Sequence, residues 1–327
     1  MDELGKGDTV ADADFKALQQ WLSGQIIGQA HLIERLMIAL LADGHLLVEG
    51  APGLAKTRAI KTLADGLEGT FHRIQFTPDL LPGDVTGTDI YRPQEASFHF
   101  QKGPIFHNLV LADEVNRAPA KVQSALLEAM AERQVSVGSQ TYPLPELFLV
   151  MATQNPIEQE GTYPLPEAQL DRFLLHVNVA YPDTAAERDI LRLTRSEASG
   201  VAGDTPPTLT QRAVFQARRD ILALHMAPPV EEYLVQLVIG SRQPELYSEQ
   251  LAGWIEYGGS PRATIALDRC ARAHAWLAGR DFVSPDDVQA IAPDVLRHRL
   301  LLSFEAEANG ISPDHVISEL LAVVPVG

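Results

Sequence analysis

The segment 50–57, Gly-Ala-Pro-Gly-Leu-Ala-Lys-Thr, most limits what this chain can fold into. It follows an apolar run at 45–48 and precedes an amphipathic stretch, so it is expected to join a strand to a helix. A glycine-rich loop in that setting presents main-chain N–H groups and a helix N-terminus to phosphate oxygens. Lys56 would reach the β- and γ-phosphates of a nucleotide, and the Thr57 hydroxyl would hold Mg²⁺. The residues expected to contact the nucleotide here are Gly50, Ala51, Pro52, Gly53, Leu54, Ala55, Lys56, Thr57 and Arg58.

One position departs from the usual phosphate-binding pattern. Ala55 stands where such loops normally carry their last glycine. A methyl group there is compatible with the loop only if the residue keeps a negative φ. The pattern therefore predicts a negative φ at Ala55.

Five short apolar runs alternate with helical patterns in roughly the first 180 residues. The runs are 46–49, 71–75, 108–112, 147–153 and 173–179. This alternation predicts an α/β fold in which a parallel, five-stranded sheet is covered by helices on both faces. Two insertions interrupt it: a segment rich in proline and glycine at about 77–106, and a hairpin at about 133–145.

The pattern changes after residue 181. Glycines and prolines at 196–208 predict a linker, and the strong patterns beyond it are helical. Leu267, Cys270, Ala271, His274 and Leu277 form one apolar stripe, and the segment 284–287, Ser-Pro-Asp-Asp, predicts a helix start. We therefore expect an α/β domain with an N-terminal helix over 1–196, followed by a linker and an all-helical domain over 197–327.

Two adjacent acids, Asp113 and Glu114, follow the apolar run at 108–112. An aspartate at the carboxyl end of a buried strand can approach the Mg²⁺ shell, usually through water, so Asp113 and Thr57 form the expected metal site. The neighbouring glutamate can orient and deprotonate an attacking water, which makes Glu114 the candidate general base. The alternative is a strand that meets a helix cap, where aspartate is common.

The chain is strongly acidic, with 26 Lys and Arg against 43 Asp and Glu and a formal net charge of −17. That balance disfavours a nucleic-acid partner, although a local basic groove stays possible. The single cysteine, Cys270, can form neither an internal disulfide nor a cysteine zinc cage, which fits a reducing compartment. The apolar runs are too short to cross a membrane and residues 1–14 do not resemble a signal peptide, so we expect a soluble, cytoplasmic protein.

Ten histidines are present without the spacing of a metal motif. Four of them lie in apolar helical or strand patterns and are expected to be packed rather than catalytic; they are His31, His45, His176 and His274.

Long, ordered motifs make the chain resemble the MoxR family of AAA+ ATPases. They are the loop 50–57, the segment 73–84 (Arg-Ile-Gln-Phe-Thr-Pro-Asp-Leu-Leu-Pro-Gly-Asp), the segment 113–119 (Asp-Glu-Val-Asn-Arg-Ala-Pro), and the segment 152–166 (Ala-Thr-Gln-Asn-Pro-Ile-Glu-Gln-Glu-Gly-Thr-Tyr-Pro-Leu-Pro). The match continues through 167–173 and 258–263 and spans roughly residues 20–300. The resemblance implies an AAA+ core with a helical lid domain, and an enzyme that hydrolyses ATP with Mg²⁺.

The resemblance also implies roles for three further catalytic residues. Asn155 is similar to the sensor that positions the attacking water, with an ordinary Asn-Pro turn as the alternative. Arg172 resembles an arginine finger that reaches the ATP of a neighbouring subunit, with an ion pair to Asp171 or Glu167 as the alternative. Arg262 resembles the second sensor, through which the lid contacts the γ-phosphate, with a residue beside a helix cap as the alternative.

Each of three other features has two possible interpretations from the sequence. Gly28 and Gln29 resemble the segment that packs on adenine, or they form an ordinary turn at a helix start. Arg117 could contact a neighbouring subunit's nucleotide or cap the next helix. Phe98 and Phe100 lie in the first insertion, where they could face a client in a central channel or form an edge strand packed on the core.

By resemblance, the chain is expected to form a homo-oligomeric ring, a hexamer, and to act as a chaperone on protein partners with von Willebrand factor A domains. A nucleic-acid motor is the first alternative, and the net charge of −17 disfavours it. A nucleotide-gated scaffold with negligible turnover is disfavoured by the joint presence of Glu114, Asn155 and Arg172. A motor subunit similar to those of magnesium chelatase is the remaining alternative.

Overall fold

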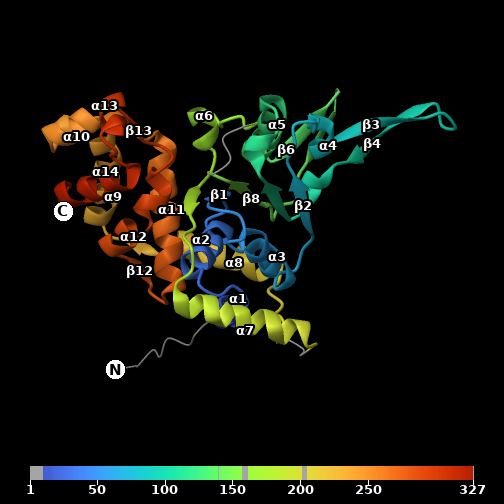
Figure 1. Cartoon of the computed structure of the whole chain (residues 1–327), viewed down its shortest axis with the longest axis horizontal. Helices are drawn as coiled ribbons and strands as arrows, with labels where there is room; N and C mark the ends of the chain where they lie inside the picture. The colour runs from blue at the N-terminus through green and yellow to red at the C-terminus, as the bar shows by residue number, and fades with distance from the viewer. Residues whose placement is uncertain (1–9, 139, 157–160, 201–204, 327) are drawn as a thin grey trace.

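The computed structural model describes residues 10–138, 140–156, 161–200 and 205–326, and a parallel sheet lies at its centre (Figure 1). The strand order is β2-β5-β8-β1-β9, and each neighbouring pair is parallel. The strands are β1 (Leu46–Glu49), β2 (Phe71–Gln75), β5 (Leu109–Asp113), β8 (Leu149–Gln154) and β9 (Leu175–Asn178). The predicted α/β fold with five parallel strands is confirmed, with small shifts at the strand ends.

Helices cover both faces of this sheet, as the apolar strands predict. Leu46 and Val48 point to one face and pack in a core with α1 (Val10–Gln25), α2 (Ala30–Leu41) and α3 (Lys56–Asp65). Leu47 points to the other face and packs in a second core with α5 (Ala120–Glu132). Successive strand residues alternate between faces, so a strand buried on both sides is apolar throughout.

The two predicted insertions are present as separate substructures. The first contains α4 (Pro82–Thr86), β3 (Gly87–Arg92), β4 (Ser97–Lys102) and the 3-10 helix η1 (Pro104–Phe106), and its hairpin extends away from the sheet (Figure 1). The second is the predicted hairpin, β6 (Gln134–Val137) and β7 (Gln140–Pro143). Phe100 stacks on Tyr142 of the second hairpin with ring centroids 4.0 Å apart, whereas Phe98 is 69% exposed. β4 pairs with β3 in a separate sheet, so of the two alternatives for this segment, β4 is not an edge strand of the central sheet.

A long helix lies between β9 and the predicted linker at 196–208 and overlaps only the first residues of that linker. Helix α7 (Thr184–Ala198) starts where the Asp183 side chain accepts a bond from the Ala186 N–H at 2.8 Å, and it runs into the predicted linker, part of which (201–204) lies outside the described residues. Beyond it, Leu209 pairs with Leu67 and brings α8 (Gln211–Leu222) onto the α/β core.

The C-terminal region is mainly helical, as predicted. Its elements are α9 (Pro228–Arg242), η3 (Pro244–Leu246), α10 (Glu249–Trp254), α11 (Pro261–Leu277), α12 (Pro285–Leu296), α13 (Phe304–Ala308) and α14 (Pro313–Val323). Four short strands add to them: β10 (His225–Met226), β11 (Ile255–Tyr257), β12 (Phe282–Val283) and β13 (Leu301–Leu302). These strands were missed because two or three residues carry no periodic pattern.

Helices α11 and α12 form the centre of that region. Leu267, Cys270 and Ala271 of the predicted stripe are fully buried, and α12 starts at the predicted capping box of Ser284 and Asp287. Burial alone would raise the pKa of Asp287, but hydrogen bonds from Arg280 and His274 lower it well below its ordinary value. Asp287 is therefore a charged, fully bonded anchor of the helical region.

Three of the four histidines expected to be packed are shielded, and one is not. His45 is buried, and the side chains of His176 and His274 are 12% and 21% exposed. His31 is half-exposed and pairs with Asp294 at 3.0 Å, so its assignment to the packed core is wrong. Among the residues that the structure describes, no helix is both long and apolar enough to span a membrane.

Candidate functional site

The loop at 50–57 lies at the carboxyl edge of the sheet together with the two acids and Asn155. The loop follows β1, Asp113 ends β5, and Asn155 follows β8; these three strands are neighbours in the order β5-β8-β1. Ligand sites of open parallel sheets form at this edge. The residues enclose a cavity of about 360 Å³ lined by Pro52, Gly53, Leu54, Ala55, Lys56, Thr57, Arg58, Asp113, Glu114, Thr153 and Asn155. We call this the P-loop cavity.

The conformation of Ala55 differs from the sequence-based expectation. Its φ is +58°, so the predicted negative φ is wrong. The loop takes the same left-handed turn that a glycine would take, and α3 begins at the next residue. A side chain in this conformation costs about 1 kcal/mol, which the surrounding fold must offset. Gly53, at +84°, takes its positive φ without that cost.

Lys56 points back across the loop. Its Nζ donates to the main-chain oxygen of Gly50 and, at 3.2 Å, to that of Gln154 at the end of β8. Partial burial lowers the pKa of Lys56, while the carboxylates of Asp113 and Glu114 oppose that shift. The ammonium group thus lies between the loop and the two acids, where it can exchange carbonyl oxygens for phosphate oxygens.

Asp113 is held by the side chains of Thr153 and Arg73, neither of which is a candidate site residue from the sequence. The Thr153 hydroxyl donates to Asp113 Oδ1 at 2.6 Å. Arg73 on β2 donates to Oδ2 through Nε at 3.0 Å and through Nη2 at 2.7 Å. The sequence signals were that Arg73 and Thr153 lie in the motif segments 73–84 and 152–166, and that Arg73 and Gln75 share one face of a strand.

Glu114 is oriented by a different set of contacts. It takes a left-handed conformation with φ +56°, and its N–H donates to the Thr153 hydroxyl at 2.9 Å. Gln75 Nε2 donates to Glu114 Oε2 at 2.8 Å, and Arg117 Nε lies 3.1 Å from the same oxygen. The side chains of the two acids are therefore held by different partners. Arg117 contacts Glu114 within its own chain, a third possibility beside the two considered from the sequence.

The oxygen groups of this cavity are those that Mg²⁺ prefers. Thr57 and Asp113 line it together, and magnesium is usually bound by one or two such protein oxygens plus substrate phosphates. Within the described residues, no cluster of three or more His, Cys, Asp or Glu has the arrangement of a metal site. The residues present fit the implied metal.

A second cavity, of about 230 Å³, adjoins the P-loop cavity and shares residues 52–55 and Arg58 with it. Gln29 lines it; this side chain is buried, and its Nε2 donates to the Ala180 oxygen at 3.1 Å. Gly28 has φ +77°, and a Cβ there would lie 2.9 Å from the Ala186 Cβ and 3.0 Å from the Pro182 Cβ. Gly28 thus allows α7 to pack closely against the start of α2, beside this cavity.

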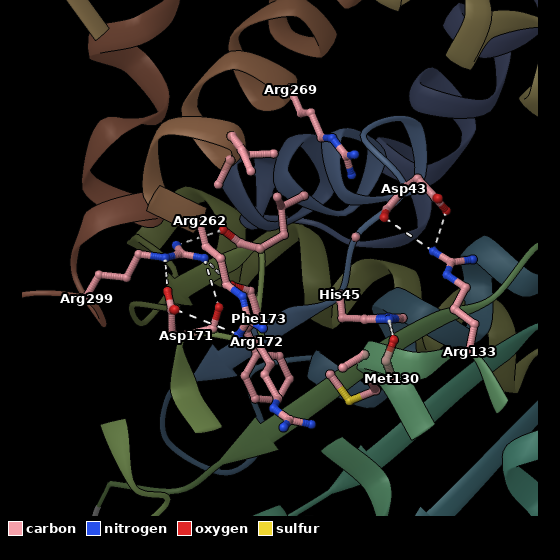
Figure 2. Close-up of a pocket in the computed structure, with 15 residues that line it drawn as sticks. Asp43, His45, Met130, Arg133, Asp171, Arg172, Phe173, Arg262, Arg269 and Arg299 are labelled. Carbon is pink, nitrogen blue, oxygen red and sulfur yellow. Dashed lines mark hydrogen bonds and ion pairs between the residues drawn. The ribbon is translucent and has the colours of Figure 1, made fainter. Parts of the chain in front are cut away.

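Arg172 and Arg262 lie elsewhere, in a third cavity of about 320 Å³ (Figure 2). Its charged residues are Arg133, Arg172, Arg262, Arg269 and Arg299, with Asp43 and Asp171. We call it the arginine cavity. The structure therefore does not bring Arg262 to the P-loop cavity of its own chain.

The contacts of Arg172 differ from the ion pair considered as an alternative. Its Nη1 donates to the main-chain oxygen of Leu127 at 2.8 Å. Asp171 instead accepts from Arg299 at 2.8 Å, while Arg262, which is exposed, lies 3.9 Å from it. Two arginines assigned to phosphate chemistry thus share one cavity whose lining includes no residue of the phosphate-binding loop.

Comparisons with known proteins agree with this geometry. The family model described as "ATPase family associated with various cellular activities (AAA)" matches residues 45–175, and the AAA lid domain model matches residues 252–320. The chaperone MoxR1 of Mycobacterium tuberculosis is 48% identical over 307 residues, covering 91% of this chain and 78% of its own. The protein MoxR of Methylorubrum extorquens is 33% identical over 325 residues, covering 92% and 91%. A solved structure of a candidate ATPase from Cytophaga hutchinsonii superposes with a TM-score of 0.89 at 44% identity, covering 97% of this chain and 96% of that one.

Proposed function

Since this chain belongs to the MoxR family of AAA+ ATPases and hydrolyses ATP, we propose that it does so in a ring of identical subunits, a hexamer, with each ATP held between two of them. In this arrangement the P-loop cavity of one subunit binds Mg²⁺-ATP, and the arginine cavity of its neighbour completes the site. The ring acts as a chaperone on protein partners.

The separation of the two cavities carries this proposal. Lys56, Asp113 and Glu114 line one cavity, while Arg172 and Arg262 line the other. An arginine stabilises phosphoryl transfer only within reach of the γ-phosphate. Arg172 and Arg262 therefore meet a nucleotide if a second copy presents its P-loop cavity to them, which a closed ring repeats at each subunit boundary.

Each residue of the P-loop cavity has its own role in the proposed reaction. Main-chain N–H groups of residues 50–57 and the Lys56 ammonium bind the phosphates, and Thr57 and Asp113 hold the metal. A magnesium ion held there would supply positive charge that neutralises the phosphates. Glu114 accepts a proton from the attacking water, and Asn155 helps to position that water. Arg172 of the neighbour stabilises the charge that develops on the departing phosphoryl group.

A mixing experiment tests the shared site. Glu114→Gln removes the base and leaves the arginines, whereas Arg172→Ala removes the finger and leaves the base. Each variant alone is expected to be inactive, and their mixture is expected to recover hydrolysis at boundaries that carry both intact groups. Phosphate release is measured on rings that native mass spectrometry shows to be mixed. The absence of recovery in such rings would contradict catalysis between subunits.

Oligomeric mass gives a second, independent test. Wild type and Glu114→Gln are compared by light scattering with and without Mg²⁺-ATP, because a nucleotide shared by two subunits stabilises their contact. A hexameric mass in the presence of nucleotide is the expected result. A monomer with full specific activity would contradict the proposal.

The client is proposed to be a protein with a von Willebrand factor A domain in the same reducing compartment, the cytoplasm. The support for a chaperone role is the similarity over 91% of this chain to a protein named as a chaperone. The test measures ATP-dependent binding of such a domain to Glu114→Gln rings, with Lys56→Ala as the nucleotide-free control. Equal binding by the two variants would contradict an ATP-driven action on that client.

A further inference from the structure

Residues 297–299 follow α12, and their side chains form hydrogen bonds to the main chain at and just before the edge strand β9 of the central sheet. Arg299 donates to three main-chain oxygens that flank Arg172: that of Asp171 at 3.4 Å, that of Phe173 at 2.6 Å and that of Leu174 at 3.3 Å. It also donates through Nε to the Asp171 side chain at 2.8 Å. One guanidinium group thus holds the backbone on both sides of Arg172 (Figure 2).

Arg299 is suited to this task by its burial. Its side chain is 2% exposed, and burial lowers its pKa while the Asp171 carboxylate opposes that shift. A guanidinium group stays charged in proteins and presents its donors in a rigid plane. Leaving such a buried group unpaired is costly, so its bonds hold residues 171–174 in one geometry.

Hydrogen bonds also link Asp171 to the helix start that carries Arg262. The second oxygen of Asp171, Oδ2, accepts from the Ser260 hydroxyl at 2.8 Å. Ser260 in turn caps α11, because its Oγ accepts from the Arg262 N–H at 3.1 Å. Asp171 therefore links Arg299, the start of α11 and the segment that carries Arg172.

We propose that Arg299 is a positioning residue for Arg172, and that it couples the position of the helical region to catalysis at the neighbouring subunit's ATP. This inference rests on the proposed function, in which Arg172 acts between subunits. Because Arg299 follows α12 and bonds the backbone beside Arg172, a displacement of α12 in one subunit displaces the arginine offered to the next one. Arg299 does not itself contact the nucleotide in this proposal.

The test compares Arg299→Lys with Arg297→Lys. Lysine keeps the charge but cannot bond three carbonyl oxygens and a carboxylate in one plane. Arg297 is the matched control, since it also joins α12 to β9, through the main-chain oxygen of His176, but away from Arg172. We expect kcat to fall about tenfold in Arg299→Lys, because misplacing a catalytic group by about 1 Å costs up to about a hundredfold. The KM for ATP and the ATP affinity should stay within about twofold, and Arg297→Lys should stay within about twofold of wild type in kcat.

Mixing separates positioning from a general loss of structure. Adding inactive Glu114→Gln should raise the turnover per Arg299→Lys subunit, because the added subunits bring intact Arg172 and Arg299 to the boundary. The mixture of Arg172→Ala with Glu114→Gln is the reference. If only the reference recovers, Arg299 has no positioning role while the proposed function stands; if neither recovers, catalysis between subunits is wrong.

Two further outcomes would overturn the inference directly. One is wild-type kcat in Arg299→Lys; the other is an equal loss of kcat in Arg297→Lys. If Arg299→Lys does not fold, as judged by circular dichroism and thermal unfolding, the double variant Asp171→Asn/Arg299→Gln removes both charges of the pair and takes its place. The same kcat, KM and mixing outcomes apply to that variant.

Discussion

The P-loop cavity and the arginine cavity are built in different ways. The P-loop cavity lies at the ends of three neighbouring strands, so the order of the sheet brings its residues together. The arginine cavity collects residues from the end of α5, the segment before β9, the start of α11 and the segment after α12. The first is built from the α/β core alone, and the second exists only when the helical region is in place.

The charges that line the two cavities also differ. Lys56 faces two carboxylates in the P-loop cavity, whereas five arginines and two aspartates line the arginine cavity. With Arg58 included, the cations and anions of the P-loop cavity balance, whereas the arginine cavity has an excess of cations that suits the phosphates of a nucleotide bound next to it. Substitutions in the two cavities should therefore affect different steps, which gives the following predictions.

The largest effect is expected for Lys56→Ala. It removes the cation that faces the β- and γ-phosphates, so ATP binding itself should be lost. Isothermal titration calorimetry with Mg²⁺-ATP measures this directly. The control is Lys61→Ala in the same helix α3, outside the P-loop cavity, which should bind as wild type does. Micromolar ATP affinity in Lys56→Ala would show that this loop is not the phosphate site.

Arg172→Ala should give the opposite signature. ATP affinity should remain within about twofold, because the P-loop cavity of the same chain is unchanged, while kcat should fall about a thousandfold, the lower range for an arginine finger. Steady-state phosphate release and equilibrium binding are measured on the same preparation. A loss of affinity that equals the loss of kcat would mean that the two cavities do not divide binding from catalysis.

Features marked by residues close together in the chain could be predicted from the sequence, and contacts that depend on the arrangement of the elements could not. The loop, its two acids and the five strands are each marked by residues close together in the chain. Arg73 and Thr153 escaped assignment because their contact with Asp113 depends on β2 and β8 flanking β5, and strand order is not written in a local pattern. Arg299 escaped for the same reason, since 128 positions separate it from Asp171.

His45, which lines the arginine cavity, should contribute to the pH dependence of folding. Burial and the nearby Arg133 lower the pKa of His45 to about 4; the neutral ring accepts from the Val150 N–H and contacts the Met130 oxygen. The unfolded chain has an ordinary histidine pKa of about 6.5, so it binds more protons than the folded chain between about pH 6.5 and pH 4. The stabilisation by neutral His45 is therefore present above about pH 6.5 and declines as the pH falls towards 4.

We expect wild type to lose about 1.4 kcal/mol of unfolding free energy from this residue between pH 7.5 and pH 5.5, the value of one pKa unit. Urea unfolding at the two pH values measures it. His45→Gln keeps a donor and an acceptor but does not titrate, so its loss should be smaller than that of wild type by this amount. Equal losses in the two proteins would show that His45 is not the group responsible.

The smallest effect is expected at Ala55, in the P-loop cavity. Its φ of +58° favours glycine, so Ala55→Gly should raise the unfolding free energy by about 0.5–1 kcal/mol, even though glycine gives the unfolded chain more freedom. Ala64→Gly, in α3 itself, is the matched control and should lower it by about 1 kcal/mol, because glycine is unfavourable within a helix. Urea unfolding without nucleotide compares the two variants. If the two variants lower the unfolding free energy equally, the left-handed conformation of Ala55 costs no free energy, and the P-loop is no more strained than α3.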